Sequence, residues 1–356
     1  MMLRSELAYE HAVSCVARRE LDAAEAALDE VGPDAGVFYA RGLQLRGRIA
    51  ETRGEYVTAA ALLRAAIEHL DRARLRDDRV ASDAIAALST FAVELLDRAL
   101  WRFVGTRANR IAGDDPHLAE GRFWVALARA QMEELEGRGG AATRAARLAE
   151  ERAPSPRGRL HARLRRATIA RLNGDAEAQR DHALHALTII AELGEDDPSE
   201  ADRRVMLTLA EELAHAGEVS HARAALHGYA DAMPARTTND PRGLVYARLV
   251  EGAIAEAAGE RVEAHHAYRD AFQGFRAMGY RRHALVAALR LADLGEQPYL
   301  YDYVAAEVRE FSARSWFGRR VVERDAPSPR AAVPSGTQSY ATNSVPLPAN
   351  AALIAP

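Results

Sequence analysis

Two histidines and a carboxylate near the middle of the chain are the residues best spaced for metal chemistry. His182 and His185 lie three positions apart in a helical pattern, and Asp181 could share their face. Two imidazoles and a carboxylate can hold a zinc ion. Histidines on solvated helices are far more common than metal ligands, however, and the sequence has neither a Cys-x-x-Cys pair nor an HExxH motif. We therefore expect no metal site.

Catalytic motifs are equally scarce. The segment Gly137-Arg138-Gly139-Gly140 has the glycine content of a phosphate-binding loop. It follows a helical segment rather than a strand and lacks the Lys-Ser/Thr pair that such loops need, so it indicates a turn. No nucleophile elbow occurs in the sequence. We therefore expect a protein that is not an enzyme and that needs no cofactor.

An arginine cluster is the clearest charge feature. Between positions 144 and 171, nine arginines are opposed only by Glu150 and Glu151. The basic patch that we define from them consists of Arg157, Arg159, Arg163, Arg165 and Arg166. Guanidinium groups bind carboxylates and phosphates through paired hydrogen bonds, so the patch could contact an acidic peptide or a nucleic acid. Alternatively, it is a solvated helix face that pairs with acidic residues of neighbouring helices. The cluster has no aromatic residue for base stacking, so direct nucleic-acid binding is not favoured.

The elements that position these residues are indicated by a repeated spacing of small residues. Its three best copies are Gly47, Gly54, Ala59 and Ala66; Ala130, Gly137, Ala142 and Ala149; and Gly252, Gly259, Ala264 and Ala271. Each copy predicts two antiparallel helices that approach closely at the small residues. The turn glycine would adopt a left-handed conformation, which other residues adopt only at a cost. We expect Gly47 to face Ala59 and Gly252 to face Ala264.

Helical periodicity predicts an all-α fold of eight helix pairs. The alanine, leucine, arginine and glutamate that dominate the composition all favour helix, and no sustained alternation indicates a strand. The expected pairs are 3–16 and 21–31, 37–52 and 56–73, 81–96 and 101–111, 117–135 and 141–153, 158–172 and 176–193, 201–216 and 219–232, 243–258 and 262–278, and 282–294 and 299–313. A single helix pair cannot bury its apolar face, so neighbouring pairs must stack.

The domain organisation follows from a change in composition. Residues 1–320 are expected to form one helical repeat array, because such an array grows in one dimension without splitting into domains. Residues 321–356 are rich in proline, serine and alanine and have no helical period. We expect this tail to be disordered.

The repeated pattern resembles the tetratricopeptide repeat family over most of residues 1–313. The resemblance implies a right-handed superhelical solenoid with a concave groove that recognises a protein or peptide. By the family's geometry, the groove is lined by Arg41, Gln44 and Arg48; Trp124, Leu127 and Gln131; His161, Leu164 and Thr168; Arg204, Leu207 and Glu211; and Tyr246, Leu249 and Ala253. Leu127, Leu164, Leu207 and Leu249 would form an apolar stripe for an extended or helical peptide. Alternatively, these leucines only pack between neighbouring repeats.

A second resemblance concerns the sensor region of LuxR/MalT-type bacterial transcription regulators. Long degenerate repeats are similar to that region, and residues 299–320, YLYDYVAAEVREFSARSWFGRR, resemble the junction helix that precedes a helix-turn-helix domain. The DNA-reading helices are replaced by the proline-rich tail. The resemblance implies a regulator part that has lost or lacks its DNA-binding domain, acting on DNA only through another domain or partner.

Charge and cysteine content bound the remaining expectations. The net charge is −4, which gives no general argument for nucleic acid or membrane. The one cysteine, Cys15, is expected to be a small buried apolar residue, which fits a reducing cytoplasm. No signal peptide and no membrane-spanning segment is expected. The aromatic-rich C-terminal pair is the surface at which a homodimer could form.

Overall fold

The computed structural model describes residues 2–111, 115, 118–193, 200–231, 240–295, 297 and 299–325, and within them all regular structure is helical. The helices are α1 (Met2–Ala17), α2 (Leu21–Leu28), α3 (Val37–Thr52), α4 (Tyr56–Ala73), α5 (Asp78–Glu94), α6 (Arg98–Arg107), α7 (Ala119–Leu135), α8 (Gly139–Glu151), α9 (Pro156–Asn173), α10 (Ala176–Leu193), α11 (Glu200–His215), α12 (Val219–Asp231), α13 (Pro241–Ala258), α14 (Arg261–Ala277), α15 (Arg281–Asp293), α16 (Tyr299–Glu307) and α17 (Trp316–Asp325). Short 3₁₀ turns cover Pro33–Ala35 and Ala108–Ile111. The predicted all-α fold is confirmed.

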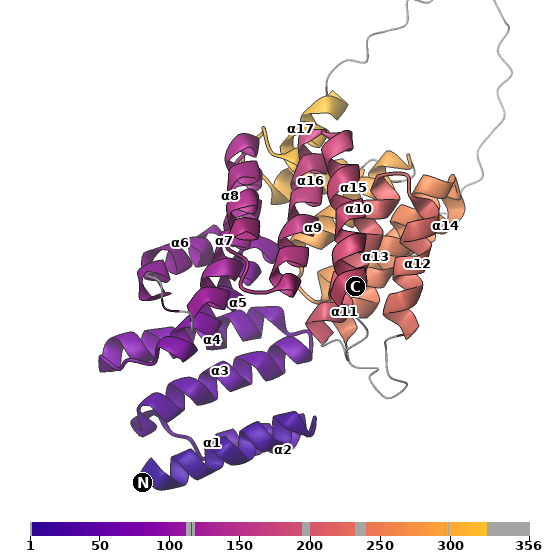
Figure 1. The fold of residues 1–356 in the computed structure, drawn as a ribbon. Coiled ribbons are helices and arrows are strands. Elements are labelled where there is room, and N and C mark those ends of the chain that lie inside the picture. Colours follow the sequence, from indigo (N-terminus) through magenta and orange to yellow (C-terminus); the bar gives the residue numbers. More distant parts are fainter. Residues whose placement is uncertain are drawn as a thin grey trace, which may run out of the picture.

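Antiparallel helices pack against each other in pairs across tight turns, as α3 does against α4 and α13 against α14 (Figure 1). The predicted left-handed turn glycines are confirmed, with φ of 81° at Gly54 and 79° at Gly259. Where the glycine is missing, another residue takes the same conformation: Arg19 has φ 63° and Leu96 has φ 54°. The pair predicted at 81–96 and 101–111, which lacks a turn glycine, therefore turns in the same way as the others, with Leu96 in the strained position.

The small residues allow close helix approach, as expected, and Gly47 faces Ala59 as predicted, but the nearest group to each glycine is a large side chain. A Cβ added to Gly252 would lie 2.6 Å from the Tyr268 ring, so this glycine faces Tyr268 rather than Ala264. A Cβ added to Gly47 would meet the Leu63 side chain at 2.9 Å and the Ala59 carbonyl oxygen at 3.4 Å. A large side chain of the second helix thus lies over each glycine, because the space left by a missing Cβ must be filled.

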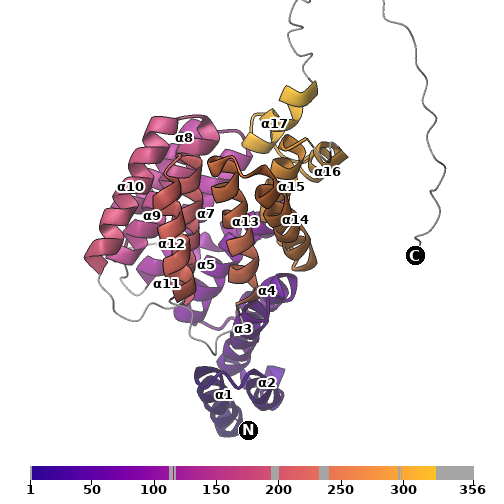
Figure 2. The same ribbon diagram turned by 90° about the vertical axis from the view of Figure 1, so that its right-hand side faces the viewer.

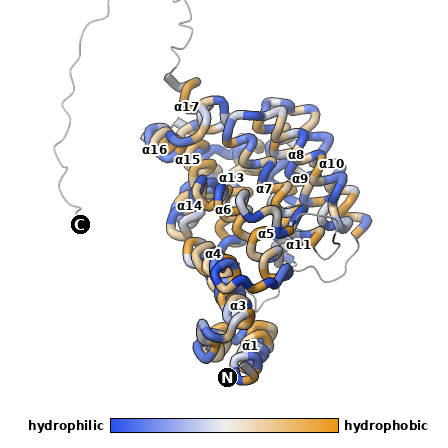
Figure 3. Tube along the Cα trace, turned by 90° about the vertical axis from the view of Figure 1, so that its left-hand side faces the viewer, coloured by the Kyte–Doolittle hydropathy of each residue, from blue (hydrophilic) through white to orange (hydrophobic). Residues whose placement is uncertain are grey.

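Helices far apart in the sequence pack together in the body of the molecule. Helices α1–α4 project from the body that α5–α17 form (Figures 1 and 2). At their junction, the Tyr56 ring of α4 lies 4.4 Å from the Tyr280 ring at the α14–α15 turn. Hydrophobic and hydrophilic residues alternate along the helices (Figure 3), and the largest cluster of buried residues runs from α3 to α17. Segments more than two hundred residues apart therefore share one core.

The C-terminal helices differ most from the prediction. Residues 299–320 do not form one junction helix: α16 ends at Glu307 and α17 begins at Trp316. The break ends at Ser315, whose hydroxyl accepts a hydrogen bond from the Gly318 N–H at 3.1 Å and so caps the start of α17. Helix α17 continues past the predicted boundary at 320 to Asp325, and residues 326–356 of the expected tail lie outside the described residues. None of the described helices is long and apolar enough to cross a bilayer.

Candidate functional site

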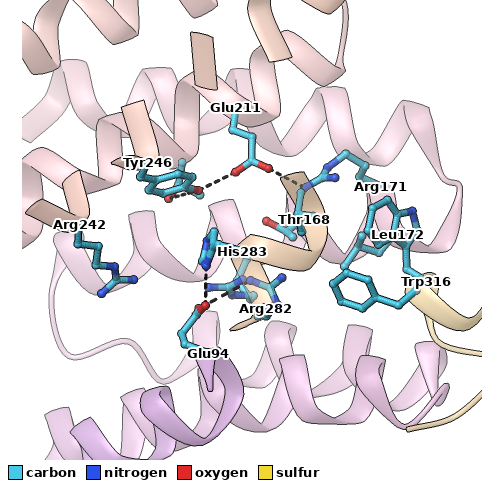
Figure 4. A pocket seen from close by; sticks show the side chains of 14 residues that line it. Glu94, Thr168, Arg171, Leu172, Glu211, Arg242, Tyr246, Arg282, His283 and Trp316 are labelled. Carbon is cyan, nitrogen blue, oxygen red and sulfur yellow. Dashed lines mark hydrogen bonds and ion pairs between the residues drawn. The ribbon is translucent and has the colours of Figure 1, made fainter. Parts of the chain in front are cut away.

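A cavity of about 70 Å³ lies where the first helices of several pairs converge (Figure 4). Its lining comes from α5, α9, α11, α13, α15 and α17, and consists of Glu94, Arg165, Thr168, Arg171, Leu172, Thr208, Glu211, Arg242, Tyr246, Arg282, His283, Val286, Trp316 and Phe317. Four of these residues are arginines and two are glutamates, so the lining carries an excess of two positive charges when His283 is counted as neutral. We call this space the central cavity.

Glu94 is the last residue of α5 and one of the two acidic groups of the cavity. It is 3 % exposed, and its carboxylate lies 2.7 Å from the His283 Nδ1 and 3.7 Å from the Arg282 Nη1, both on α15 (Figure 4). Burial alone would raise the pKa of the Glu94 carboxyl, but His283 and Arg282 together hold it well below its ordinary value. Glu94 is therefore ionised, and its contacts link α5 to α15.

Glu211 of α11 is the second acidic group of the cavity. It accepts a hydrogen bond of 2.6 Å from the Tyr246 hydroxyl of α13, and its carboxylate lies 3.4 Å from the Arg171 Nη2 (Figure 4). Arg171 also donates to both oxygens of the neighbouring Glu212, at 3.0 and 3.1 Å. Burial, together with Arg171 and Arg290, lowers the pKa of the adjacent His215 to about 4, so that this imidazole stays neutral. All the groups of this cluster are mutually satisfied.

Two arginines of the cavity have no carboxylate partner within the described residues. Arg165 donates only to the side-chain oxygen of Gln131, at 2.6 Å from Nη1, when the Gln131 amide is oriented to receive it. Burial and the charge of Arg282 lower the pKa of the Arg165 guanidinium to about 10. Arg242 instead lies over the Tyr280 ring, with its guanidinium carbon 4.6 Å from the ring centroid. Neither guanidinium group thus has an ion-pair partner within the described residues, although for Arg242 burial is outweighed by the nearby Tyr280 and Glu94, which raise its pKa above the ordinary value.

Helix α17 closes one end of the central cavity. Trp316 and Phe317 line the cavity, and Phe317 is 2 % exposed. The Glu134 carboxylate of α7 accepts a hydrogen bond of 2.8 Å from the Trp316 backbone N–H, and the Arg319 guanidinium donates to the Leu172 carbonyl at the end of α9. These two aromatic side chains therefore face inward, and of the expected dimerisation surface Tyr299 is the exposed aromatic residue. Dimerisation stays a prediction.

The chemistry that the cavity offers is recognition of negative charge. Guanidinium groups present N–H donors in a fixed fork that matches carboxylate and phosphate oxygens. A cluster of at least three histidine, cysteine or acidic side chains that could hold a metal does not occur among the described residues. The side chain of His182 lies 3.3 Å from the Arg163 Nη1, and this cationic surrounding, added to burial, lowers the pKa of the His182 imidazole to about 4.

The groove positions predicted on α3 form a separate group at the other end of the molecule. Arg41 donates to the Asp77 carboxylate at 2.9 Å, and Gln44 donates to the Asp83 carboxylate at 3.0 Å. Both contacts reach across to the segment that begins α5, so they tie successive helix pairs together. Arg48 is exposed, and no hydrogen bond or ion pair of its side chain occurs within the described residues.

The remaining groove positions divide between packing and the central cavity. The leucines are 0–5 % exposed, so they pack between helices and present no apolar stripe to solvent: Leu127, Leu164, Leu207 and Leu249. Trp124 and His161 are half-buried and meet edge to face at 5.0 Å, and Arg204 pairs with Asp240 at 3.8 Å. Thr168, Glu211 and Tyr246 do lie together, as lining of the central cavity. Gln131 lies next to them through its contact with Arg165.

The predicted basic patch is not one surface. Arg157 and Arg159 are exposed at the start of α9. Arg163 and Arg166 both pair with Glu150 of α8. These two therefore match the alternative in which the arginines pair with acidic residues of neighbouring helices. Arg165 points the other way, into the central cavity. The helical period explains this division, because residues two positions apart on a helix face different sides.

Four of the fourteen lining residues were among the candidate site residues: Arg165, Thr168, Glu211 and Tyr246. Glu94, Arg242, Arg282 and His283 were not among the candidates, and Trp316 and Phe317 were expected on a dimerisation surface instead. One local signal was available: Glu94 stands alone in the apolar run Phe91-Ala92-Val93-Glu94-Leu95-Leu96, and a buried charge in such a run needs a partner. The partner itself lies almost two hundred residues away on α15, where no sequence pattern points to it.

Comparison with known proteins gives no match: neither a protein-family model nor a curated protein matches this chain. The resemblance to the tetratricopeptide repeat family therefore rests on the repeated spacing alone.

Proposed function

We propose that this chain is a non-catalytic scaffold that binds a protein or peptide through its first helix pairs. The observation that carries the proposal is a surface of Tyr9, Phe38, Arg41 and Arg48, which we call the α1–α3 face. The half-buried rings of Tyr9 and Phe38 lie 6.1 Å apart, and the Arg41 guanidinium lies 5.3 Å from the Phe38 centroid. Aromatic and arginine side chains are enriched where proteins bind partners.

The position of this face supports the proposal. Helices α1–α3 project from the body of later helices (Figures 1 and 2), which leaves room beside them for a partner. Arg48 lies two helical turns beyond Arg41 on α3, so the two guanidinium groups follow one side of the helix. A peptide with acidic side chains spaced along its length would meet Arg48 and the Nη donors of Arg41, whose Nε already donates to Asp77. An apolar side chain of the same peptide would contact Tyr9 and Phe38.

The same proposal includes the overall arrangement of the helix pairs. We infer a right-handed superhelical solenoid of the tetratricopeptide type, with the α1–α3 face on its concave side. In support, the first helices of successive pairs contact each other, as α9 does α11 and α11 does α13. The central cavity would then be the tightest part of the concave channel, and at about 70 Å³ it is too small for a peptide. A peptide partner is therefore assigned to the open end of the channel.

The scaffold proposal is tested with the intact chain as bait and the double variant Arg41→Ala/Arg48→Ala beside it. Arg144→Ala is the matched control, since Arg144 is exposed on α8, away from the α1–α3 face. A partner identified by mass spectrometry is then purified, and its Kd for each chain is measured. We expect at least tenfold weaker binding by the double variant, about 1.4 kcal/mol, and unchanged binding by the control. Equal Kd values for all three chains would refute the assignment to this face.

A second candidate function is that of a sensor part of a LuxR/MalT-type regulator that has lost or lacks its DNA-binding domain. The observation that favours it is α17, whose Trp316 and Phe317 line the central cavity. Whatever occupies the cavity would contact the helix from which the C-terminal residues continue. Immunoprecipitation from cells after crosslinking separates the two candidates, because a sensor that acts through a DNA-binding partner is recovered with promoter DNA and a scaffold unconnected to transcription is not.

A further inference from the structure

The uncompensated arginines of the central cavity need a counter-charge. A cation removed from water is costly unless a partner of opposite charge replaces the lost hydration. Arg165 donates to the neutral Gln131 amide, and Arg242 lies over aromatic rings, with the Glu94 carboxylate acting on it from beyond ion-pair distance. Within the described residues, the Nε atoms of Arg165 and Arg282 also lack a hydrogen-bond acceptor. Donors are thus in excess in the cavity, and acceptors are missing.

The acidic groups nearby are already engaged. Glu94 is paired with His283 and Arg282, and Glu211 accepts from Tyr246 while it lies beside Arg171. Glu134 accepts from the Trp316 backbone N–H. None of these carboxylates can turn toward Arg165 or Arg242 without leaving its own donor unpaired, which would cost as much as it gained.

We propose that the central cavity is a binding site for a small anion, a carboxylate or phosphate group, held between Arg165, Arg242 and Arg282. Its oxygens would accept the guanidinium hydrogen atoms that have no acceptor in the chain itself. The volume fits such a group, because one water needs roughly 10–15 Å³ of such space and the cavity has about 70 Å³. The rest of a larger ligand would have to extend past Trp316 and Phe317. The inference goes beyond the partner-binding proposal and does not depend on it.

The site discriminates by charge. A cation would meet four arginines, and a neutral molecule would supply no counter-charge. An anion is the one class of small ligand that lowers the free energy of the site, because it neutralises two buried guanidinium groups at once. Thr168 and Thr208 add hydroxyl groups to the wall, so oxygens not bound by arginine also face polar partners.

The test measures the thermal midpoint of the purified intact chain in inorganic phosphate, in citrate and in sodium chloride of equal ionic strength. A ligand that binds only the folded state raises the midpoint by mass action. We expect a saturable rise of several degrees with phosphate, with citrate or with both, and none with chloride. A rise with phosphate alone identifies a phosphate site, and a rise with citrate alone identifies a carboxylate site. Absence of any rise above that in chloride overturns the proposal.

Variants place the effect in the cavity. The double variant Arg165→Gln/Arg242→Gln should raise at least tenfold the anion concentration that gives half of the maximal rise in thermal midpoint. Arg159→Gln, at an exposed arginine of α9, should leave this concentration unchanged. An equal response in all three chains would mean surface binding and would overturn the proposal.

Arg165→Met is a second variant that keeps the test decisive if the double variant fails to fold. Removing an unpaired buried cation in favour of an apolar side chain of similar length is neutral or stabilising when the anion is absent. We therefore expect a midpoint in chloride at or above that of the unmodified chain, together with a weakened anion response. A midpoint that falls in chloride would show that Arg165 is already satisfied and would overturn the proposal. Because these readouts need no protein partner, they fail or succeed separately from the pull-down of the scaffold proposal.

Discussion

At the scale of single residues, the feature that distinguishes this chain is a buried carboxylate that faces an arginine and a histidine. Glu94 follows three apolar residues at the end of α5; it is almost fully enclosed, and its carboxylate faces His283 and Arg282 of α15. Removing one partner of a buried ion pair costs far more than a surface pair contributes, because the remaining charge is left without compensation. Glu94 should therefore matter more to stability than any exposed glutamate.

Glu94→Gln should reduce the free energy of unfolding by about 3 kcal/mol, because it leaves Arg282 and His283 without their counter-charge while it keeps the shape of the side chain. Urea unfolding followed by circular dichroism measures this loss. Glu151→Gln is the control, since Glu151 is exposed and its pair with Arg147 at 3.5 Å is a surface pair. The control should change the free energy by at most about 0.5 kcal/mol. Equal losses in both variants would contradict this role of Glu94.

The pH dependence of the same residue has a definite sign. The pKa of the Glu94 carboxyl is lowered on folding, so the unfolded chain binds its proton more readily than the folded chain does. Its contribution is therefore complete above the ordinary glutamate pKa of about 4.3 and is lost as the pH falls below that value. The stability difference between the unmodified chain and Glu94→Gln should shrink as the pH falls from about 5 to about 3. Urea midpoints across this range test the prediction, and a difference that grows in acid would contradict it.

At the scale of elements, each helix pair depends on a small residue that a large side chain covers. Gly252→Ala should destabilise the chain by about 1–3 kcal/mol, because the added Cβ would lie 2.6 Å from the Tyr268 ring. Gly105→Ala, inside α6 with no atom near the added Cβ, should instead stabilise it by about 0.5–1 kcal/mol. Thermal unfolding of both variants measures the difference. If Gly252→Ala proves neutral, the close approach of α13 and α14 is not the constraint that we describe.

The helices were predictable from the sequence because their signals are local. The expected 37–52 and 56–73 coincide with α3 and α4, and the turn glycines have the predicted left-handed backbone. Both signals are set within a few residues by helical period and by the freedom of glycine. The break between α16 and α17 was missed because it depends on the cap at Ser315 and on the docking of α17 against α7.

The central cavity could be predicted only in part. Thr168, Glu211 and Tyr246 were predicted to line a concave groove, and they lie together in the lining of the central cavity. Glu94, Arg242 and Arg282 could not be placed with them, because their approach depends on how far each pair rotates relative to the last. Small rotations add up over several pairs, and no single repeat encodes the sum.

At the scale of the whole molecule, the important feature is the contact of α4 and α5 with α13–α15, which we call the seam. An open array of repeats couples only neighbouring units. Here Tyr56 of α4 contacts Phe91 of α5 at 5.9 Å and Tyr280 at 4.4 Å, and Arg242 lies over Tyr280. The early helices thus share an aromatic cluster with α13–α15, and they should lose stability when a distant residue of that cluster is removed.

Tyr280→Ala tests this coupling. The residue is fully buried, and truncating a buried aromatic side chain costs about 3–5 kcal/mol. If the seam couples distant pairs, hydrogen exchange in α4, more than two hundred residues away in sequence, should accelerate along with exchange in α15. Phe123→Ala is the matched control, because Phe123 is an equally buried aromatic residue that packs in a separate cluster with Leu127, Ala149 and Ala162. It should accelerate exchange in α7 and α8 and leave α4 protected. Equal hydrogen-exchange protection of α4 in both variants would mean that the seam contributes no coupling free energy between distant helices. The helix pairs would then behave as an open array.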